Sequence, residues 1–526
     1  MSATADPAKA DPTRSQSAWQ SLLDWLFQPI DAGLLVFFRI SFGLLMTWEA
    51  SRYLTSRFRG LDWIQRLYLE PQILFKYYGF EWVHPWPGDW MYSHFWGLGI
   101  LGLLIAAGCL YRLAMTLFFL GFTYIFLQDQ AAYLNHFYLI SQVSFVMIFL
   151  PLNRACSVDA WLWPKIQSVT APAWTLWLLR FEVGIAYTFG GIAKINGDWL
   201  GGEPMRSWLA ERSEQTPTEL MVAFYSWGGM LFDLLIVPAL LWPKTRIPAF
   251  LAALFFHFSN DQMFQIGVFP WFMVAGTLLF MPPEWVQLKP KDDEAKKASG
   301  GHKPHGVSRK HSTKQIVVAS LLIFWVALQC LVPFRHLLYP GNVSWTEEGH
   351  RFAWHMKLRA KAPDEFRLIA VTKSGRELAW YLGQRNPTDE ASGLPYIDAE
   401  TGEPILEEYL GFYAIDAAGN RIELDDPAEG AITAKQIHGI TTKPDMLLQF
   451  AHFLGQRLRE TGYEPVAIYA RPVTASLNNR PPQTLIDPDV NLLEVKRSLA
   501  HADWIVPLTT PLKPSWQPEA PPRTTP

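Results

Sequence analysis

Long apolar runs alternate with short polar connections from about residue 34 to residue 334, and the pattern changes afterwards. A helix needs about 20 residues to cross the hydrocarbon core of a bilayer. Several runs are shorter or contain polar residues, which favours contact with neighbouring helices or a cavity over contact with lipid. The pattern predicts about nine transmembrane helices, and a very large soluble helical core is the alternative. The predicted spans are residues 33–50, 90–110, 113–128, 136–152, 173–193, 219–242, 246–259, 264–281 and 315–335.

The chain after Phe334 has the composition of a soluble domain. Short alternating stretches, FRLIAVT, LAWYLG, GFYAID and VAIYARPV, are typical of strands, and turn-forming residues at 373–375 and 418–420 separate them. Between them, Asp445 to Thr461 carries apolar residues at helical spacing. The sequence therefore predicts a mainly α polytopic membrane protein with a C-terminal β-rich extramembrane domain that contains one amphipathic helix.

The remaining segments complete the predicted domain organisation. An amphipathic stretch from Trp19 to Phe27 is expected to lie in the membrane interface. The predicted units are an N-terminal tail with this helix (1–30), a transmembrane domain (31–282), a basic cytoplasmic linker (283–314), the last transmembrane helix (315–335), the β-rich domain (336–510) and a Pro-rich tail (511–526).

The distribution of basic residues sets the expected orientation. With a cytoplasmic N-terminus, nine spans place the β-rich domain outside the cytoplasm, and the even-numbered connections, including the Lys- and Arg-rich linker, face inward. The basic residues in the 51–89 connection run against this assignment. The expected location is a bacterial inner membrane, because no cleavable signal peptide is visible.

Composition agrees with a membrane protein and excludes some functions. Half of the chain is hydrophobic, 14% is aromatic with 24 Trp, and 18% is charged, below the roughly 25% usual for soluble proteins. The 45 basic and 48 acidic residues balance, so nucleic acid is not an expected partner. The three cysteines lack metal-type spacing. The three histidines of the linker could bind a metal, but the charged, Gly-containing linker is more typical of a solvated, flexible connection, so no metal site is predicted.

Three polar clusters stand out at the ends of apolar runs. Lys194 follows some twenty apolar residues and is either a snorkelling anchor or a functional amine, and spacing alone favours the anchor. Asn135 and His136 open the fourth span, and His257 and Asn260 close the seventh. A lone histidine is more often structural than catalytic, but the predicted topology brings all three clusters to the side of the β-rich domain.

These clusters lie in stretches that together resemble the vitamin K-dependent gamma-glutamyl carboxylase family, within the wider group of horizontally transferred transmembrane-domain proteins. The matching pieces follow in order over most of residues 30 to 505. They are FRISFGLLM, LYRLAMTLFFLGFTYIFLQDQAAYLNHFYL, SVDAWL, IAKINGDW, FHFSNDQMFQIGVFPW, PPEW, WTEEGHRFAWHMKLRA, PDMLLQFAHFLGQRL and IDPDVNLLEV.

The resemblance implies site residues. Lys194 matches the base that deprotonates vitamin K hydroquinone, and Asn135 and His136 match a pair that assists the later steps. A solvated lysine is a poor base at pH 7, but desolvation at an apolar helix end favours the neutral amine, so the resemblance reverses the preference for an anchor. The residues expected to bind the quinone or line its pocket are His257, Asn260, Asp198, Trp199, Arg180, Trp354 and Met356.

The resemblance also implies the reaction. The hydroquinone anion reacts with O2 to give a strongly basic intermediate that removes a γ-proton from a protein glutamate; the carbanion adds CO2 and the quinone leaves as its epoxide. The expected cofactor is vitamin K hydroquinone or a menaquinol-type quinone, and the expected partners are the bilayer and a Glu-containing peptide or protein. Two alternatives remain: a hydroquinone epoxidase without carboxylation, and a non-catalytic membrane module that binds lipid, quinone or a partner.

Overall fold

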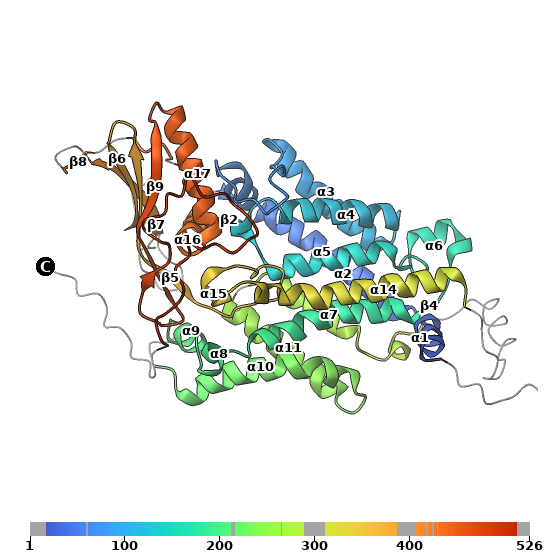
Figure 1. Cartoon of the computed structure of the whole chain (residues 1–526). Coiled ribbons are helices and arrows are strands. Elements are labelled where there is room, and N and C mark those ends of the chain that lie inside the picture. The colour runs from blue at the N-terminus through green and yellow to red at the C-terminus, as the bar shows by residue number, and fades with distance from the viewer. Residues whose placement is uncertain are drawn as a thin grey trace, which may run out of the picture.

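The computed structural model describes residues 17–58, 61–211, 216–264, 266–288, 311–386, 407–415, 419–422, 425–428 and 430–512. The long helices lie side by side, and the C-terminal sheet caps one end of this bundle (Figure 1). The first part of the predicted N-terminal tail (1–16), most of the predicted linker (289–310) and the predicted Pro-rich tail from residue 513 lie outside the described residues.

A helix forms in each predicted span. Five of these helices, α2, α3, α7, α10 and α14, are long and apolar enough to cross a membrane, whereas α4, α5 and α12 are apolar but shorter. The structure thus supports a membrane protein, and the predicted count of nine crossings is not confirmed. The helices are α2 (Gly33–Thr55), α3 (Asp89–Ala107), α4 (Tyr111–Phe126), α5 (Asn135–Phe149), α7 (Ala173–Ala193), α10 (Glu219–Leu241), α11 (Arg246–Phe264), α12 (Phe269–Leu278) and α14 (Thr313–Leu331).

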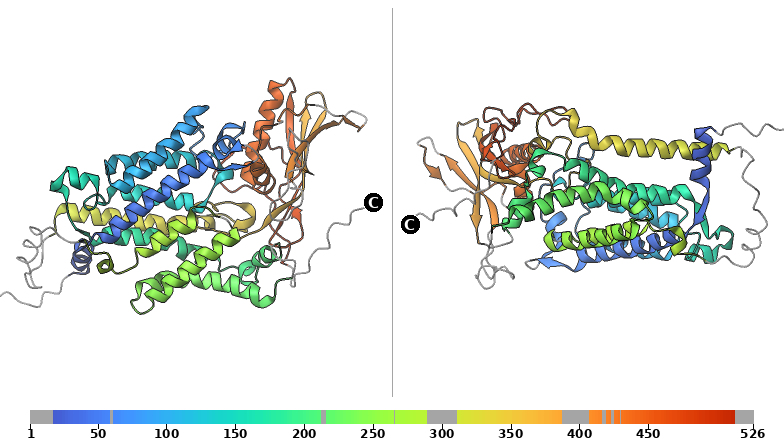
Figure 2. Two further views of the ribbon diagram at one scale, coloured as in Figure 1. Left: turned by 180° about the vertical axis from the view of Figure 1, so that it is seen from behind. Right: turned by 90° about the horizontal axis from the view of Figure 1, so that it is seen from below.

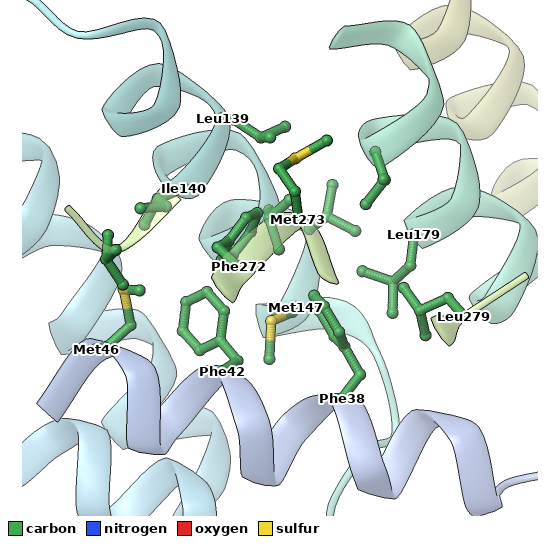
Figure 3. Packing of buried hydrophobic residues seen from close by; sticks show 14 of the residues in the cluster. Phe38, Phe42, Met46, Leu139, Ile140, Met147, Leu179, Phe272, Met273 and Leu279 are labelled. Atoms are coloured by element: carbon green, nitrogen blue, oxygen red, sulfur yellow. The ribbon is translucent and has the colours of Figure 1, made fainter. Parts of the chain in front are cut away.

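Large apolar side chains fill the centre of the bundle. Phe38, Phe42 and Met46 of α2 point toward Phe272 and Met273 of α12, with side chains of α5 and α7 around them (Figure 3). Where helices approach most closely the sequence has glycine: a Cβ on Gly191 of α7 would lie 2.9 Å from the backbone nitrogen of Leu234 in α10. Small residues allow such close helix packing in membranes.

The last helix, α14, is attached to the bundle by a polar contact. Glu182 of α7 is fully buried and accepts hydrogen bonds from Trp325 Nε1 at 2.6 Å and from Gln329 Nε2 at 3.4 Å, both on α14. Most of the remaining surface of α14 is exposed and apolar. A buried carboxyl group needs such partners because an unpartnered one is costly in an apolar environment.

The short helix α1 (Ala18–Phe27) lies across the end of the bundle that is opposite to the C-terminal sheet (Figure 2). A capping box between Ser17 and Gln20 begins it. Leu23 and Leu26 pack with Ala319 of α14, and Trp25 lies 5.1 Å from Trp177 of α7. This placement fits the interfacial helix that its amphipathic pattern predicts.

A six-stranded antiparallel sheet forms the C-terminal domain, in the order β10-β9-β5-β6-β7-β8. The helices α16 and α17 cover one face of the sheet. Leu368 and Trp380 are opposite each other on neighbouring strands, and both lie in the same buried cluster as Leu454 of α17. The strands are β5 (Lys361–Thr372), β6 (Glu377–Arg385), β7 (Glu407–Ile415), β8 (Arg421–Ile422), β9 (Pro465–Leu477) and β10 (Gln483–Thr484), and the helices are α15 (Val343–Thr346), α16 (Ala434–Thr442) and α17 (Pro444–Glu460).

The prediction of a single helix in this domain is wrong. The predicted amphipathic helix is α17, but α16 precedes it, and the single-turn α15 lies before the sheet. The segment AKQIHGITT of α16 is short and rich in β-branched residues and glycine, which have low helix propensity. Its start is fixed by a capping box between Thr433 and Gln436 and by burial of Ile437 and Ile440.

Shorter elements connect these parts. Two small antiparallel pairs, β1 (Pro29–Asp31) with β4 (Thr170–Pro172) and β2 (Arg57–Phe58) with β3 (Leu61–Asp62), join neighbouring loops. The remaining turns of helix are α6 (Val158–Leu162), α8 (Gly197–Leu200), α9 (Met205–Glu211), a π-helical turn (Gln65–Leu69) and 3₁₀ turns at Gln130–Ala132, Pro164–Ile166, Pro283–Trp285 and Val332–Leu338.

Polar contacts hold the C-terminal domain against the bundle. Asp198, in α8, accepts two 2.6 Å hydrogen bonds from the Arg480 guanidinium and one of 2.8 Å from Asn478 Nδ2. On the other side of the interface, Gln436 Nε2 donates to Asp129 Oδ2 at 3.0 Å. These contacts fix the domain over the end of α7 where Lys194 lies.

We expect Arg480→Ala to lower the midpoint of thermal unfolding of the purified protein. Asp198 would lose a bidentate partner in a largely buried position, and hydrogen bonds to charged groups contribute about 1.5–3 kcal/mol. The control is Arg471→Ala, because the Arg471–Asp489 pair is exposed and such pairs contribute about 0–1 kcal/mol. Equal shifts in the two variants would contradict the interface role.

Candidate active site

A buried ion pair lies where α7 ends. Lys194 is the C-cap residue of α7, and its ammonium group contacts the Oδ2 atom of Asp233, near the middle of α10. The side chains of Lys194 and Asp233 are 9% and 5% exposed. The Lys194 Nζ atom also lies 5.2 Å from the centre of the Trp199 ring. Because isolated charges are very costly in an apolar environment, each member of the pair depends on the other.

A second polar pair lies between α7 and α11. The Tyr187 hydroxyl is 2.5 Å from His257 Nε2 and 3.4 Å from the hydroxyl of Thr277. The other ring nitrogen of His257, Nδ1, is buried and has no hydrogen-bond partner among the described residues. Buried polar atoms are usually paired, so an unpaired one beside a cavity indicates a place where a ligand can bind.

Both pairs border one cavity of about 330 Å³, a size within the range of small-molecule sites. Aromatic and aliphatic side chains form most of its wall, and Phe232 and Phe256 stack there at 4.0 Å. Phe224 of α10 and Phe255 of α11 line it although they are 61% and 67% exposed. The cavity therefore reaches the outer surface of the bundle between α10 and α11, where lipid would lie.

Five of the predicted site residues line this cavity: Lys194, Trp199, His257, Asn260 and Met356. Met356 comes from the segment after α14 and extends to Gly190, where a Cβ would lie 2.9 Å from its Cε. These five residues come from three separate parts of the chain.

Three predicted residues lie behind the cavity wall. The His136 ring lies 5.4 Å from Phe269, which lines the cavity. Asn135 donates to the backbone oxygen of His355 at 3.3 Å. Trp354 is buried and packs 5.0 Å from Tyr138. These side chains support the wall and the approach of the C-terminal segment.

Two further predicted residues lie elsewhere. Asp198 pairs with Arg480 at the domain interface. Arg180 precedes Lys194 by almost four helical turns, about 20 Å along α7, and its guanidinium donates to the backbone oxygens of Leu279 and Met281. Neither is among the residues that line the cavity, so their placement does not support direct binding of a quinone.

Asp233 and Tyr187 were not anticipated from the sequence. Asp233 is an acidic residue within the apolar run GGMLFDLLIVPALL, and a lone intramembrane charge signals function or a buried partner. That signal was available, although the identity of the partner was not. Tyr187 gave no signal, because tyrosine is common in apolar helices.

Within the described residues, no group of three or more His, Cys, Asp or Glu side chains is arranged to hold a metal ion. The cavity offers instead an amine, a carboxylate, an imidazole and an amide among apolar walls. Such a lining suits an organic ligand that is largely apolar and carries a few polar groups.

Two family profiles match the chain on either side of the linker. The profile described as HTTM domain matches residues 27–285. The profile described as vitamin K-dependent gamma-carboxylase, lumenal domain, matches residues 313–382 and 408–511. The chain belongs to the vitamin K-dependent gamma-carboxylase family. No solved structure matches it.

Membership of the gamma-carboxylase family gives the two halves a common context. The bundle with Lys194 corresponds to the HTTM part, and Met356 comes from the part that matches the lumenal domain. Because the family is vitamin K-dependent, the expected ligand has a ring with two oxygens and an isoprenoid tail. The polar groups and the apolar opening of the cavity fit both features.

A double-mutant cycle tests the buried pair. We expect Lys194→Met and Asp233→Asn each to lower the midpoint of thermal unfolding strongly, because loss of one partner from a buried pair costs about 3–5 kcal/mol. The unfolding midpoint of the double variant should fall by much less than the sum of the two single-variant decreases, since no unpaired charge remains. Lys165→Met, at an exposed lysine, serves as the control. Additive losses would show that the pair is not coupled.

Proposed function

We propose that this protein is a membrane enzyme of the gamma-carboxylase type, which oxygenates a vitamin K-type hydroquinone to its epoxide and couples this reaction to carboxylation of glutamate in a peptide. The observation that carries the proposal is the meeting of the Lys194–Asp233 pair and the unpaired Nδ1 atom of His257 at one apolar cavity. The bound hydroquinone would supply the electrons for O2 reduction.

The Lys194–Asp233 pair is suited to accept a proton. As a carboxylate and an ammonium it is electrically neutral and has one free basic position. Taking a proton from a ligand hydroxyl gives the pair one positive charge beside the anion that it has produced, so the cavity as a whole stays neutral. Lys194 faces the cavity. It can pass its own proton to the Asp233 carboxylate and take the proton of the ligand hydroxyl in its place, so the added proton ends on Asp233 and the positive charge stays on Lys194.

The Tyr187–His257 pair is suited to hold the ligand. Thr277 donates its hydroxyl hydrogen to the backbone oxygen of Met273 at 2.7 Å, and its 3.4 Å contact with the Tyr187 hydroxyl is the longer of the two contacts that compete for the single Tyr187 hydrogen. At 2.5 Å from His257 Nε2, the Tyr187 hydroxyl is the natural donor to the ring. This assignment leaves the ring proton on Nδ1, where it can be donated to a ligand oxygen. Asn260, on the same helix, offers a further polar group.

The apolar cavity wall would exclude water from the reacting atoms and leave an opening to lipid for the isoprenoid tail. Asn135 and His136 would act through Phe269 and the 355–356 backbone, and Trp354 would hold Met356 against Gly190. Glutamate would enter from the side of Met356 and Lys357, where the lumenal-type part of the chain reaches the cavity. We assign this side to the exterior of the cytoplasm, in a bacterial inner membrane.

A second candidate is a non-catalytic module that binds quinone or lipid. One observation favours it: Asp233 already satisfies Lys194, as in a purely structural ion pair. An epoxidase without carboxylation is an intermediate possibility. These candidates differ in products that can be measured separately.

We expect the purified protein in lipid nanodiscs to form epoxide from reduced vitamin K and O2, and to incorporate labelled CO2 into a Glu-containing peptide. Lys194→Ala should lower epoxide formation at least about 100-fold, because general base catalysis contributes about 10²–10⁴-fold. The matched control is Lys165→Ala, at an exposed lysine in the 3₁₀ turn that follows α6, a helix at the end of the bundle away from the C-terminal sheet (Figure 1).

Epoxide without labelled peptide would assign the protein as an epoxidase. Binding of the quinone without any product would assign the non-catalytic module. Undiminished epoxide formation by Lys194→Ala would refute the assignment of Lys194 as the base.

A further inference from the structure

A second cavity lies at the junction of the helical bundle and the C-terminal domain. Its volume is about 660 Å³, and among the described residues none lines both this cavity and the one at Lys194. Its walls come from the loop before α3, the 335–352 segment, the beginning of α17 and the 495–505 segment.

The acidic side chains of this cavity are already paired. Glu347 accepts from Arg359 at 2.6 Å, Asp445 from Arg497 at 2.6 Å, and Glu348 lies 3.0 Å from His501 Nδ1. Asp503 lies 3.8 Å from the other nitrogen of His501.

Arg351 and Lys443 are among the basic side chains of the cavity that have no carboxylate partner within the described residues. In the part of the chain that the structure describes, no acidic group lies within ion-pair distance of Arg351 or Lys443. Lys443 is also the N-cap of α17, where the helix dipole favours negative charge. The cavity therefore has an excess of positive charge that an anion would neutralise.

The electrostatic effect of this excess is visible at two titratable groups. Burial opposes ionisation of Glu347, yet Arg359, Lys361 and Lys443 hold its pKa below the ordinary value. Burial and the repulsion from Arg351 and Arg359 lower the pKa of Lys443 to about 8, although Glu347 opposes this change. A bound anion would remove part of that repulsion.

Among the described residues that line this cavity, two have a buried polar atom with neither a hydrogen-bond nor an ion-pair partner. These atoms are the hydroxyl of Tyr77, which is 4% exposed, and Oε1 of Gln130, which is 2% exposed. Both residues line the cavity. The hydroxyl can donate to an anionic oxygen, whereas Gln130 Oε1 can only accept, so it requires a ligand that also carries a donor such as a hydroxyl group.

The rim of the cavity is apolar and continues the exposed surface of α14. Leu331, Leu337 and Leu338, at the end of this helix and in the 3₁₀ turn after it, are 68%, 69% and 82% exposed. Leu338 lines the cavity together with Phe80 and Leu499, which are 37% and 66% exposed. The exposed face of α14 is the kind of surface that acyl chains cover, and it leads to the cationic cavity.

We propose that this cavity binds the headgroup of an anionic phospholipid, with the phosphate between Arg351 and Lys443 and the acyl chains along Leu338 and α14. A hydroxylated headgroup such as glycerol would donate to Gln130. The lipid class is favoured over an acidic peptide because the apolar rim adjoins a lipid-covered helix. The site does not depend on the reaction at Lys194.

The test uses the full-length protein, purified in a neutral detergent, and isothermal titration with dioctanoyl phosphatidylglycerol. We expect saturable binding that is at least tenfold weaker in Lys443→Ala and in Arg351→Ala. Dioctanoyl phosphatidylcholine should bind at least tenfold more weakly than phosphatidylglycerol to the unchanged protein. Lys373→Ala, at a lysine whose side chain is 75% exposed, should bind phosphatidylglycerol normally.

Leu338→Asn keeps the result decisive if the basic-residue variants fold poorly, because this exposed side chain is not needed for folding. This variant should weaken the binding of phosphatidylglycerol several-fold. The lipid assignment would be overturned in favour of a free-anion site if inorganic phosphate bound as tightly as phosphatidylglycerol and if Leu338→Asn changed the affinity for neither. A Glu-rich pentapeptide that binds through Lys443 while phosphatidylglycerol does not would also overturn it, as would phosphatidylglycerol binding that is insensitive to all three variants.

Discussion

Water is largely excluded from the interior of a membrane bundle, so a charged group placed there needs a partner inside the protein. Lys194 and Asp233 meet this requirement through each other, across the contact between α7 and α10. That contact is close because Gly191 brings α7 against the backbone of α10. A larger residue at 191 would separate the helices and also the pair, so close packing, charge neutrality and the candidate chemistry depend on the same few atoms.

The candidate site needs both halves of the protein. The bundle supplies the polar groups, and the segment after α14 supplies Met356, which fits against Gly190. This segment is held in place from two directions: Asn135 donates to the backbone oxygen of His355, and Asp198 binds Arg480 of the domain. Asp198 therefore affects the cavity by fixing the domain.

The sequence predicted the parts of the fold that depend on local composition. Apolar length located all the long helices, and helical periodicity located α17. Sheet order was not predictable, because β9 pairs with β5 across about a hundred residues of chain, and α16 was missed because its segment favours a helix only when packed. At the site, resemblance supplied five residues that line the cavity, Lys194 among them. Asp233 was missed because its partner lies 39 residues away in sequence, and the resemblance did not show how far Arg180 lies from Lys194 along α7.

The link between Glu182 and α14 has a consequence for biosynthesis. Glu182 belongs to α7, whereas its hydrogen-bond donors, Trp325 and Gln329, are synthesised more than 140 residues later. Until α14 enters the membrane, the carboxyl group of α7 lacks these two donors. Docking of α14 is therefore favoured, because it supplies the two hydrogen-bond donors that the Glu182 carboxyl group lacks until then. The C-terminal domain is synthesised after α14. The helical bundle can therefore be complete before the domain that covers its end has been made.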